Sequence, residues 1–350
     1  MKRKIAIIAG GDSSEYEVSL RSAAGIYSFM DKERYDLTVV RLHGNDWQAL
    51  PAFDGTNPEV LTEDGCPIDR NDFSFTRGGV KHTFDFAYIT IHGTPGENGI
   101  LQGYLDMLRL PYSCCGVLAA AMTFNKYACN HYLNAFGFKI AKSILLRKAE
   151  WRNGKINEKM VNDQIVNDLG LPCFIKSNVG GSSFGCTKAK TPESIIPAIE
   201  RAFEEGDEVI CESYMKGTEV TCGVYKTKEK AVAFPITEVV TKNEFFDYDA
   251  KYRGQVDEIT PARIPDEVRD AIQAETLRIY DIIGAQGIIR VDWIITDTIN
   301  LLEVNTTPGM TPTSFIPQQV RAAGLDIKDV LTDIIEDHFV KGTKTASLKE

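Results

Sequence analysis

The chain has 350 residues and a mass of 38.9 kDa, and its shares of hydrophobic residues (43%) and charged residues (25%) are those of an ordinary globular protein. These proportions exclude a disordered chain, a collagen and a coiled coil, and the length predicts two or three domains. The net charge of −10 repels a phosphate backbone at long range. Nucleic acid is therefore a poor partner, and any anionic ligand must meet a locally basic site.

The cysteines and the N-terminal pattern both favour the cytoplasm. The eight cysteines form no C-x-x-C pair, and several stand inside apolar runs, which predicts buried thiols in a reducing compartment. The apolar stretch at residues 5–9 is too short for a signal peptide, and no run approaches the ~18–20 apolar residues of a membrane span. We expect a cytoplasmic protein with no membrane partner.

The first third of the chain alternates strands and helices. The patterns predict strands at 4–9, 37–42 and 84–91, a helix opened by a capping box of Ser14 and Glu17, and a second helix at 99–110. This alternation indicates a parallel α/β sheet, whose ligand loops would be 10–15 and 92–98. Residues 45–81 are rich in Gly, Pro, Asn and Asp, and we interpret them as a variable insertion.

A new unit begins near Pro111. The predicted elements are a helix at 123–136, a strand at 140–146, a helix at 158–169, a strand at 173–176 and a helix at 192–204. The pattern then becomes strand-rich, with strands at 208–212, 219–225 and 231–236, a long helix at 265–283 and two final strands. The tail at 341–350 is polar.

The strongest chemical signal lies in the segment 287–305, where four polar residues stand among apolar ones: Arg290, Asp292, Glu303 and Asn305. A hairpin with a two- or four-residue loop centred between residues 297 and 298 pairs Asp292 with Glu303 and Arg290 with Asn305, all on one face. Two facing carboxylates repel each other unless a cation lies between them, and oxygen ligands select Mg²⁺ or Mn²⁺. The alternative is a structural ion pair of the two acids with Arg290.

The second signal is a strand that ends at Lys176 and continues into a loop rich in Gly and Ser, up to Gly185. Glycines allow backbone N–H groups to approach an anion, and the lysine supplies charge. The loop matches neither a P-loop nor a dinucleotide fingerprint, and an ordinary turn is the alternative.

Four further features each have a functional and a structural interpretation. His92 is a ligand contact or a histidine at the rim of the sheet, and Glu15 is a substrate carboxylate or a favourable charge at a helix start. The segment 245–252 is a lid or a solvated loop, and Lys126 is a ligand contact or a surface lysine. The five histidines do not cluster, so a zinc site is not expected.

Taken together, these stretches resemble the D-alanine–D-alanine ligases of the ATP-grasp superfamily over nearly the whole chain. The motifs that carry the resemblance are Gly10-Gly-x-Ser-x-Glu-x-Glu-Val-Ser-Leu20, His92-Gly-x-x-Gly-Glu-Asn-Gly-x-Leu-Gln-Gly103, Gly180-Gly-Ser-Ser-x-Gly185, Tyr248-x-Ala-Lys-Tyr252, Arg290-Val-Asp292 and Leu302-Glu-Val-Asn-Thr-x-Pro-Gly-Met-Thr311. The resemblance implies an α/β ATP-grasp fold of three α/β domains with an N-terminal Rossmann-like parallel sheet. The implied divisions are a substrate domain at 1–112, a central subdomain at 113–211, a C-terminal subdomain at 212–340 and the tail at 341–350.

The resemblance also implies a role for individual residues. The ligands of two Mg²⁺ or Mn²⁺ ions would be Asp292, Glu303 and Asn305; the ATP contacts would be Lys126, Lys176, Glu212, Met215, Glu219 and the lid residue Lys251. The first D-alanine would meet Glu15 and His92, with Ser182 and Tyr252 completing the hydrogen-bonded set. The oxyanion would meet Arg290 and Gly309, and the second carboxylate would meet Ser314 and Phe315.

The implied reaction is ATP-dependent ligation of two D-alanines through a D-alanyl phosphate, for peptidoglycan precursor synthesis, by a homodimer. The alternatives are another carboxylate–amine ligase and a nucleotide-binding module that has lost its chemistry. Tyr252 favours an amino acid over a hydroxy acid as second substrate. The chain departs from the family pattern at Asn125, where Asp is common, and at Ser177, where Pro is common.

Overall fold

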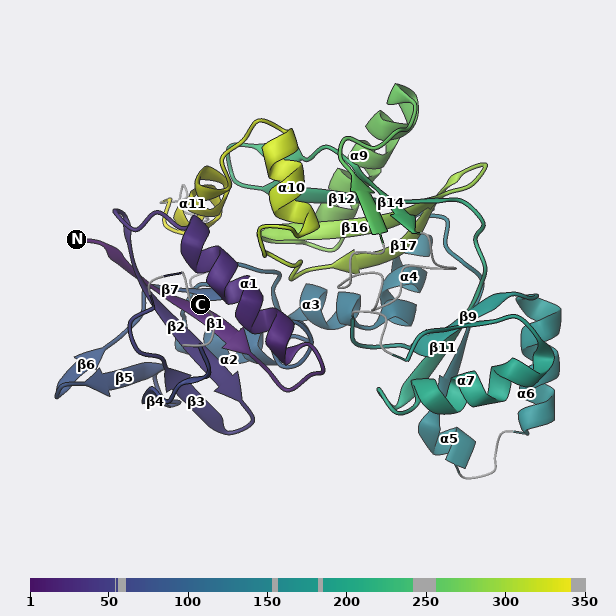
Figure 1. The fold of residues 1–350 in the computed structure, drawn as a ribbon, viewed down its shortest axis with the longest axis horizontal. Helices are drawn as coiled ribbons and strands as arrows, with labels where there is room; N and C mark the ends of the chain where they lie inside the picture. Colours follow the sequence, from purple (N-terminus) through teal and green to yellow (C-terminus); the bar gives the residue numbers. More distant parts are fainter. Residues whose placement is uncertain (54, 56–60, 153–156, 182–184, 242–255, 341–350) are drawn as a thin grey trace, which may run out of the picture.

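The computed structural model describes residues 1–53, 55, 61–152, 157–181, 185–241 and 256–340. Its strands form three sheets that lie along the long axis of the molecule (Figure 1). The predicted lid at 245–252, the tail at 341–350 and the predicted site residues Ser182, Lys251 and Tyr252 lie outside the described residues.

The first sheet has a parallel centre, as predicted. β1 (Arg3–Gly10) lies between β2 (Tyr35–His43) and β7 (Phe86–Ile89) and is parallel to both. Residues of β1 alternate between two cores: Ile5 and Ile7 pack with α1 (Tyr16–Phe29), whereas Ala6 and Ile8 pack with α2 (Ile100–Leu108). Burial of both faces explains the continuous apolar run of β1 and leaves its carboxyl end free to carry a loop.

The segment interpreted as an insertion is part of this sheet. It contributes the antiparallel strands β3 (Asp46–Ala49), β4 (Cys66–Asp69), β5 (Ser74–Arg77) and β6 (Val80–His82), which give the order β6-β5-β4-β3-β2-β1-β7. Each strand has three or four residues, too few to show a clear alternation, so the sequence pattern did not reveal them.

The predicted helix at 123–136 is wrong in its bounds. The chain instead forms α3 (Val117–Phe124) and α4 (Lys126–Asn134), separated by Asn125, whose backbone is extended (φ −91°, ψ 100°). The side chain of Asn125 accepts a hydrogen bond from the N–H of Ala128 and so caps α4. Periodicity continues across the break because both helices bury apolar residues against the third sheet.

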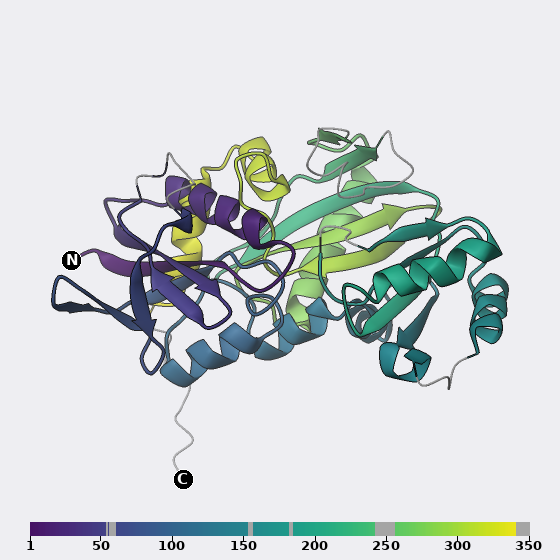
Figure 2. The same ribbon diagram turned by 60° about the horizontal axis from the view of Figure 1, so that its bottom comes forward.

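The second sheet is antiparallel, in the order β10 (Thr187–Ala189), β9 (Cys173–Ser177), β11 (Glu208–Ser213) and β8 (Ser143–Arg147). The short α5 (Lys148–Arg152) follows β8, and α6 (Glu158–Asp168) and α7 (Ile195–Ala202) pack on the sheet through one apolar core. The predicted helix at 192–204 begins as a 3-10 turn at Pro192–Ser194. Figure 2 shows this sheet at the end of the molecule opposite the first sheet.

The third sheet has the order β15 (Val256–Ile259), β14 (Thr237–Thr241), β12 (Thr218–Lys226), β16 (Ile288–Ile295) and β17 (Ile299–Asn305), and β13 (Ala231–Ala233) also pairs with β12. One face packs against α9 (Asp266–Ile282), α3 and α4. The chain then returns to the first sheet through α10 (Phe315–Ala322) and α11 (Ile327–Asp337), where Glu336 pairs with Arg3 at 3.2 Å.

Among the described residues, no helix combines the length and the apolar character needed to cross a bilayer. All eight cysteines are free thiols, and all but Cys66 and Cys186 are buried, as predicted for most of them.

Candidate active site

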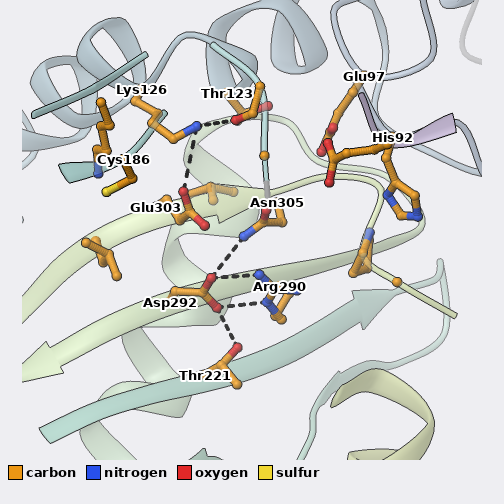
Figure 3. Close-up of a pocket in the computed structure, with 18 of the residues that line it drawn as sticks. His92, Glu97, Thr123, Lys126, Cys186, Thr221, Arg290, Asp292, Glu303 and Asn305 are labelled. Atoms are coloured by element: carbon orange, nitrogen blue, oxygen red, sulfur yellow. Dashed lines mark hydrogen bonds and ion pairs between the residues drawn. The ribbon is translucent and has the colours of Figure 1, made fainter. Parts of the chain in front are cut away.

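A cavity of about 1280 Å³ is lined by residues of the second and third sheets and by residues that follow β1 and β7 of the first sheet. Every predicted site residue that the structure describes lines it: Glu15, His92, Lys126, Lys176, Glu212, Met215, Glu219, Arg290, Asp292, Glu303, Asn305, Gly309, Ser314 and Phe315. Residues separated by almost the whole chain thus share one cavity, and part of it is shown in Figure 3.

The predicted pairing of the β16–β17 hairpin is confirmed: Asp292 lies opposite Glu303, and Arg290 lies opposite Asn305. The predicted loop is wrong. Nearer the turn Ile295 pairs with Ile299, which leaves a three-residue loop. An extra residue, Leu302, forms a bulge that restores the predicted pairing.

The bulge contacts α4 and also lines the cavity. The side-chain amide of Asn130 donates a hydrogen bond to the carbonyl oxygen of Leu302 at 3.1 Å. Leu302 and Glu303, although consecutive, both line the cavity.

Asp292 is the centre of a polar network on the cavity face of β16 (Figure 3). Arg290 donates two hydrogen bonds to its carboxylate, at 2.8 and 2.7 Å, and Asn305 donates a third at 3.1 Å. Thr221 on β12 donates a fourth at 2.6 Å. Burial alone would lower the pKa of Arg290, but the charge of Asp292 raises it. The structural ion pair that was the alternative interpretation is therefore present for Asp292.

The donor set also suits a hard divalent ion. Glu303, opposite Asp292, lies 3.8 Å from the ammonium group of Lys126. No group of three or more His, Cys, Asp and Glu side chains that could hold a metal occurs within the described ranges. Two carboxylates and one amide are the kind of partial ligand set that Mg²⁺ completes with substrate phosphates. Asp292, Glu303 and Asn305 would hold such an ion, because their side-chain oxygens are the ligands that a hard cation prefers.

Two lysines bring positive charge to the same cavity. Lys176 on β9 pairs with Glu212 at 2.7 Å, and Lys126 at the start of α4 donates to the carbonyl oxygen of Gly180 at 2.5 Å. Burial alone would lower the pKa of Lys176, but the charges of Glu212 and Glu303 raise it above its usual value. Lys176 therefore remains charged at neutral pH, as a site for polyphosphate requires.

Three ionisable side chains gather where the first sheet meets the cavity. Glu15 and His92 are 7% exposed, and the ring Nε2 of His92 lies 3.0 Å from the hydroxyl of Ser22. Burial lowers the pKa of His92, and the charge of Glu15 opposes that shift only in part. Burial and the charge of Glu15 raise the pKa of Glu97 to about 7. The cluster therefore holds a neutral imidazole beside a carboxylate.

The capping box predicted at Ser14 is absent. Glu15 itself is the N-cap residue of α1, and no side chain caps this helix. The hydroxyl of Ser13 accepts a hydrogen bond from the N–H of Glu15 and donates one to the carbonyl oxygen of His92. This arrangement links the two ligand loops predicted at the carboxyl ends of strands.

The last predicted group lies at the N-terminus of α10. Ser314 is its N-cap residue, and the guanidinium of Arg290 lies 5.3 Å from the ring centroid of Phe315. Gly309 is adjacent, since a Cβ atom there would lie 3.0 Å from the hydroxyl of Ser314. The positive end of a helix dipole and a guanidinium thus face one part of the cavity.

Sequence reasoning gave no role to Glu97 or Thr221. Glu97 lies within the motif that begins at His92, and this place in the motif is the only feature of the sequence that could have indicated a role. Thr221 pairs with Asp292 across β12 and β16, and only the strand register places its hydroxyl on the carboxylate.

Comparisons with known proteins identify the family. A family model described as the D-ala D-ala ligase N-terminus matches residues 4–115, and one described as the D-ala D-ala ligase C-terminus matches residues 132–336. The chain belongs to the D-alanine–D-alanine ligase family. Its fold is the ATP-grasp fold of that family, as expected.

Relatives of this family match along their full length. A D-alanine–D-alanine ligase of Bacteroides fragilis is 64% identical over 343 residues, 97% of this chain and 100% of the relative. The VanG D-Ala:D-Ser ligase of Enterococcus faecalis superposes with a TM-score of 0.83 at 30% identity, over 97% of this chain and 100% of that chain. A D-alanine–D-alanine ligase of Bacillus anthracis complexed with ATP gives a TM-score of 0.73 at 27% identity, over 96% of this chain and 97% of that chain.

Proposed function

We propose that this protein joins two D-alanines into D-alanyl-D-alanine, with conversion of ATP to ADP and phosphate, for peptidoglycan precursor synthesis. The observation that carries the proposal is the pair Asp292 and Glu303, held opposite each other on the cavity face of β16 and β17 and facing Lys126. Membership of the ligase family and the full-length match to its relatives support the same activity.

The first step would be attack of one D-alanine carboxylate on the γ-phosphate of ATP, which forms an acyl phosphate and releases ADP. Glu15 and His92 would hold this amino acid, with Ser182 and Tyr252, and the three lysines Lys126, Lys176 and Lys251 would contact the phosphates. Glu212, Met215 and Glu219 would hold adenine and ribose. Two Mg²⁺ or Mn²⁺ ions held by Asp292, Glu303 and Asn305 would spread the charge of the transferred phosphoryl group.

In the second step the amine of another D-alanine would attack the acyl carbonyl, and the tetrahedral intermediate would release phosphate. Arg290 and the N–H of Gly309 would stabilise its oxyanion, and Ser314 and Phe315 at the start of α10 would bind the second carboxylate. The buried Asp292 contact holds Arg290 in a fixed orientation, which is the preorganisation that oxyanion stabilisation needs.

The test is phosphate release from ATP with D-alanine, L-alanine, D-serine and D-lactate compared, with the product identified by mass spectrometry. Release that requires D-alanine and yields the dipeptide supports the proposal. Release with D-alanine only in the presence of D-serine would point to the specificity named for the Enterococcus faecalis relative. Release independent of any added amino acid would overturn the ligase assignment.

We also propose a cytoplasmic homodimer. The free thiols favour the reducing cytoplasm. Exposed apolar side chains gather on two helices that contact each other, with Ile100 and Met107 on α2 and Val117 and Leu118 on α3. Light scattering should give twice the chain mass, and L118E should reduce it, whereas M160E on the second sheet's helix α6 should not; a monomeric native protein would contradict this.

A further inference from the structure

Asn178 is fully buried just beyond the end of β9, two residues after Lys176, and uses both atoms of its amide. Its oxygen accepts a hydrogen bond from the N–H of Tyr127 at 2.8 Å, and its nitrogen donates one to Glu208 at 2.8 Å. Its backbone N–H also donates to the carbonyl oxygen of Glu208 at 2.9 Å. A side chain of this size that must accept at one end and donate at the other has to be an amide.

The same residue holds the start of α4, the helix that begins with Lys126. The N–H of Lys126 donates to the carbonyl oxygen of Asn178 at 3.0 Å, and the next N–H donates to its side chain. The third N–H, from Ala128, is accepted by Asn125 at 2.9 Å. The first two N–H groups of α4, which no helix can satisfy internally, therefore attach the helix to the loop that follows Lys176, and Asn125 satisfies the third.

Glu208 joins the two asparagines. One oxygen of its carboxylate accepts from Asn178 and from Asn125, the latter at 3.2 Å, and the other accepts from Arg147 at 3.1 Å. An aspartate at position 125 would place a second carboxylate against Glu208, whereas asparagine both caps the helix and donates. This contact suits asparagine rather than aspartate at position 125.

We infer that Asn178, Asn125 and Glu208 are positioning residues that fix Lys126 relative to Lys176, and that they set the affinity for ATP. None of them lines the cavity, so they act through the two lysines. Lys126 is held to this loop twice, by its own N–H to Asn178 and by its ammonium group to Gly180. This inference rests on the proposed role of the two lysines as phosphate contacts.

The experiment is a double-mutant cycle between Asn178 and Glu208. N178D places two carboxylates together and should raise the KM for ATP by about tenfold or more while the KM for D-alanine changes by less than about twofold. Adding E208Q to N178D should restore the hydrogen bond with donor and acceptor exchanged, because an amide at position 208 can donate to a carboxylate at position 178. N178D/E208Q should therefore return the KM for ATP to within about threefold of the native value.

The matched control is N157A. Asn157 is the N-cap residue of α6, as Asn125 is of α4; it accepts from the N–H groups of Lys159 at 2.9 Å and Met160 at 3.2 Å, and it is exposed. Its loss should lower the melting temperature without changing either KM. If N178D does not fold, N125D and N125D/E208Q test the same contact at a less buried position.

An unchanged KM for ATP in N178D or N125D, or double variants whose effects are only the sum of the single ones, would overturn the inference. ATP affinity is also measured by calorimetry without turnover. Native protein that binds ATP but forms no dipeptide would contradict the proposed function alone, and the cycle in ATP affinity would still decide the role of Asn178.

Discussion

The carboxylate of Glu15 lies against the α-carbon of Gly181: a Cβ atom at that position would be 2.7 Å from one carboxylate oxygen and 2.9 Å from the other. G181A must therefore displace Glu15. Because the displaced atoms end a flexible side chain, we expect a change in unfolding free energy below about 1 kcal/mol, whereas the KM for the first D-alanine should rise about tenfold. Steady-state kinetics and denaturant unfolding measure the two quantities.

The control for this variant is G103A. Gly103 lies within α2, and a Cβ atom there would meet only Val117, at an ordinary distance of 3.7 Å. Alanine should stabilise the helix by roughly 0.5–1 kcal/mol and leave the kinetics unchanged. Equal KM values for G181A and native protein would remove Glu15 from the substrate pocket.

E303Q tests the metal ligands. The substitution keeps the shape of Glu303 but removes one negative charge from the Asp292–Glu303 pair, so we expect an intact fold and a loss of about 100-fold in turnover at a Mg²⁺ concentration that saturates the native protein. The dependence of turnover on Mg²⁺ and Mn²⁺ should shift to higher concentration. E229Q, on an exposed residue, is the control, and native-like turnover of E303Q would count against the metal site.

T221V removes the hydroxyl that donates to Asp292 at 2.6 Å. Hydrogen bonds to charged groups contribute about 1.5–3 kcal/mol, so kcat/KM should fall about 10- to 100-fold if Asp292 must be held in one orientation. T276V is the matched control, because Thr276 is also buried and accepts from Trp293 on the opposite face of the sheet. It should lower the melting temperature only; identical kinetics in the two variants would refute the role of Thr221.

Glu97 predicts a pH dependence of stability. Its pKa of about 7 in the folded protein lies above the usual value near 4.3 of an unfolded chain, so the folded state binds the proton more tightly. Stability from this group is complete below about pH 4 and is lost as pH rises through about 7. E97Q should therefore match native protein in thermal melts near pH 4 and exceed it near pH 8. Parallel melting curves across that range would show that Glu97 has an ordinary pKa.

The sequence predicted what depends on local periodicity. The alternation of polar and apolar residues placed Asp292 and Glu303 on one face of a hairpin. Val291 and Trp293, on either side of Asp292, are apolar and face the core. The same logic located β1 and β7 and the loops that follow them.

What the sequence left open depends on partners far along the chain. The break at Asn125 is tied to Glu208, 83 residues away, and no local pattern contains that contact. Glu15 faces Gly181, and its own position at the start of α1 replaced the expected cap at Ser14. The raised pKa of Glu97 arises from burial and from Glu15, both of which exist only in the folded protein.

In a regular strand only every second side chain faces a given side of the sheet. The extra residue Leu302 interrupts this alternation in β17. With Leu302 as the extra residue, Trp293 pairs with the apolar Leu301 towards the core, and Asp292 pairs with the acidic Glu303 towards the cavity. A homologous chain that is one residue shorter at this point would still place its acidic residue opposite Asp292. It would lack the apolar residue that precedes the acid here, Leu302.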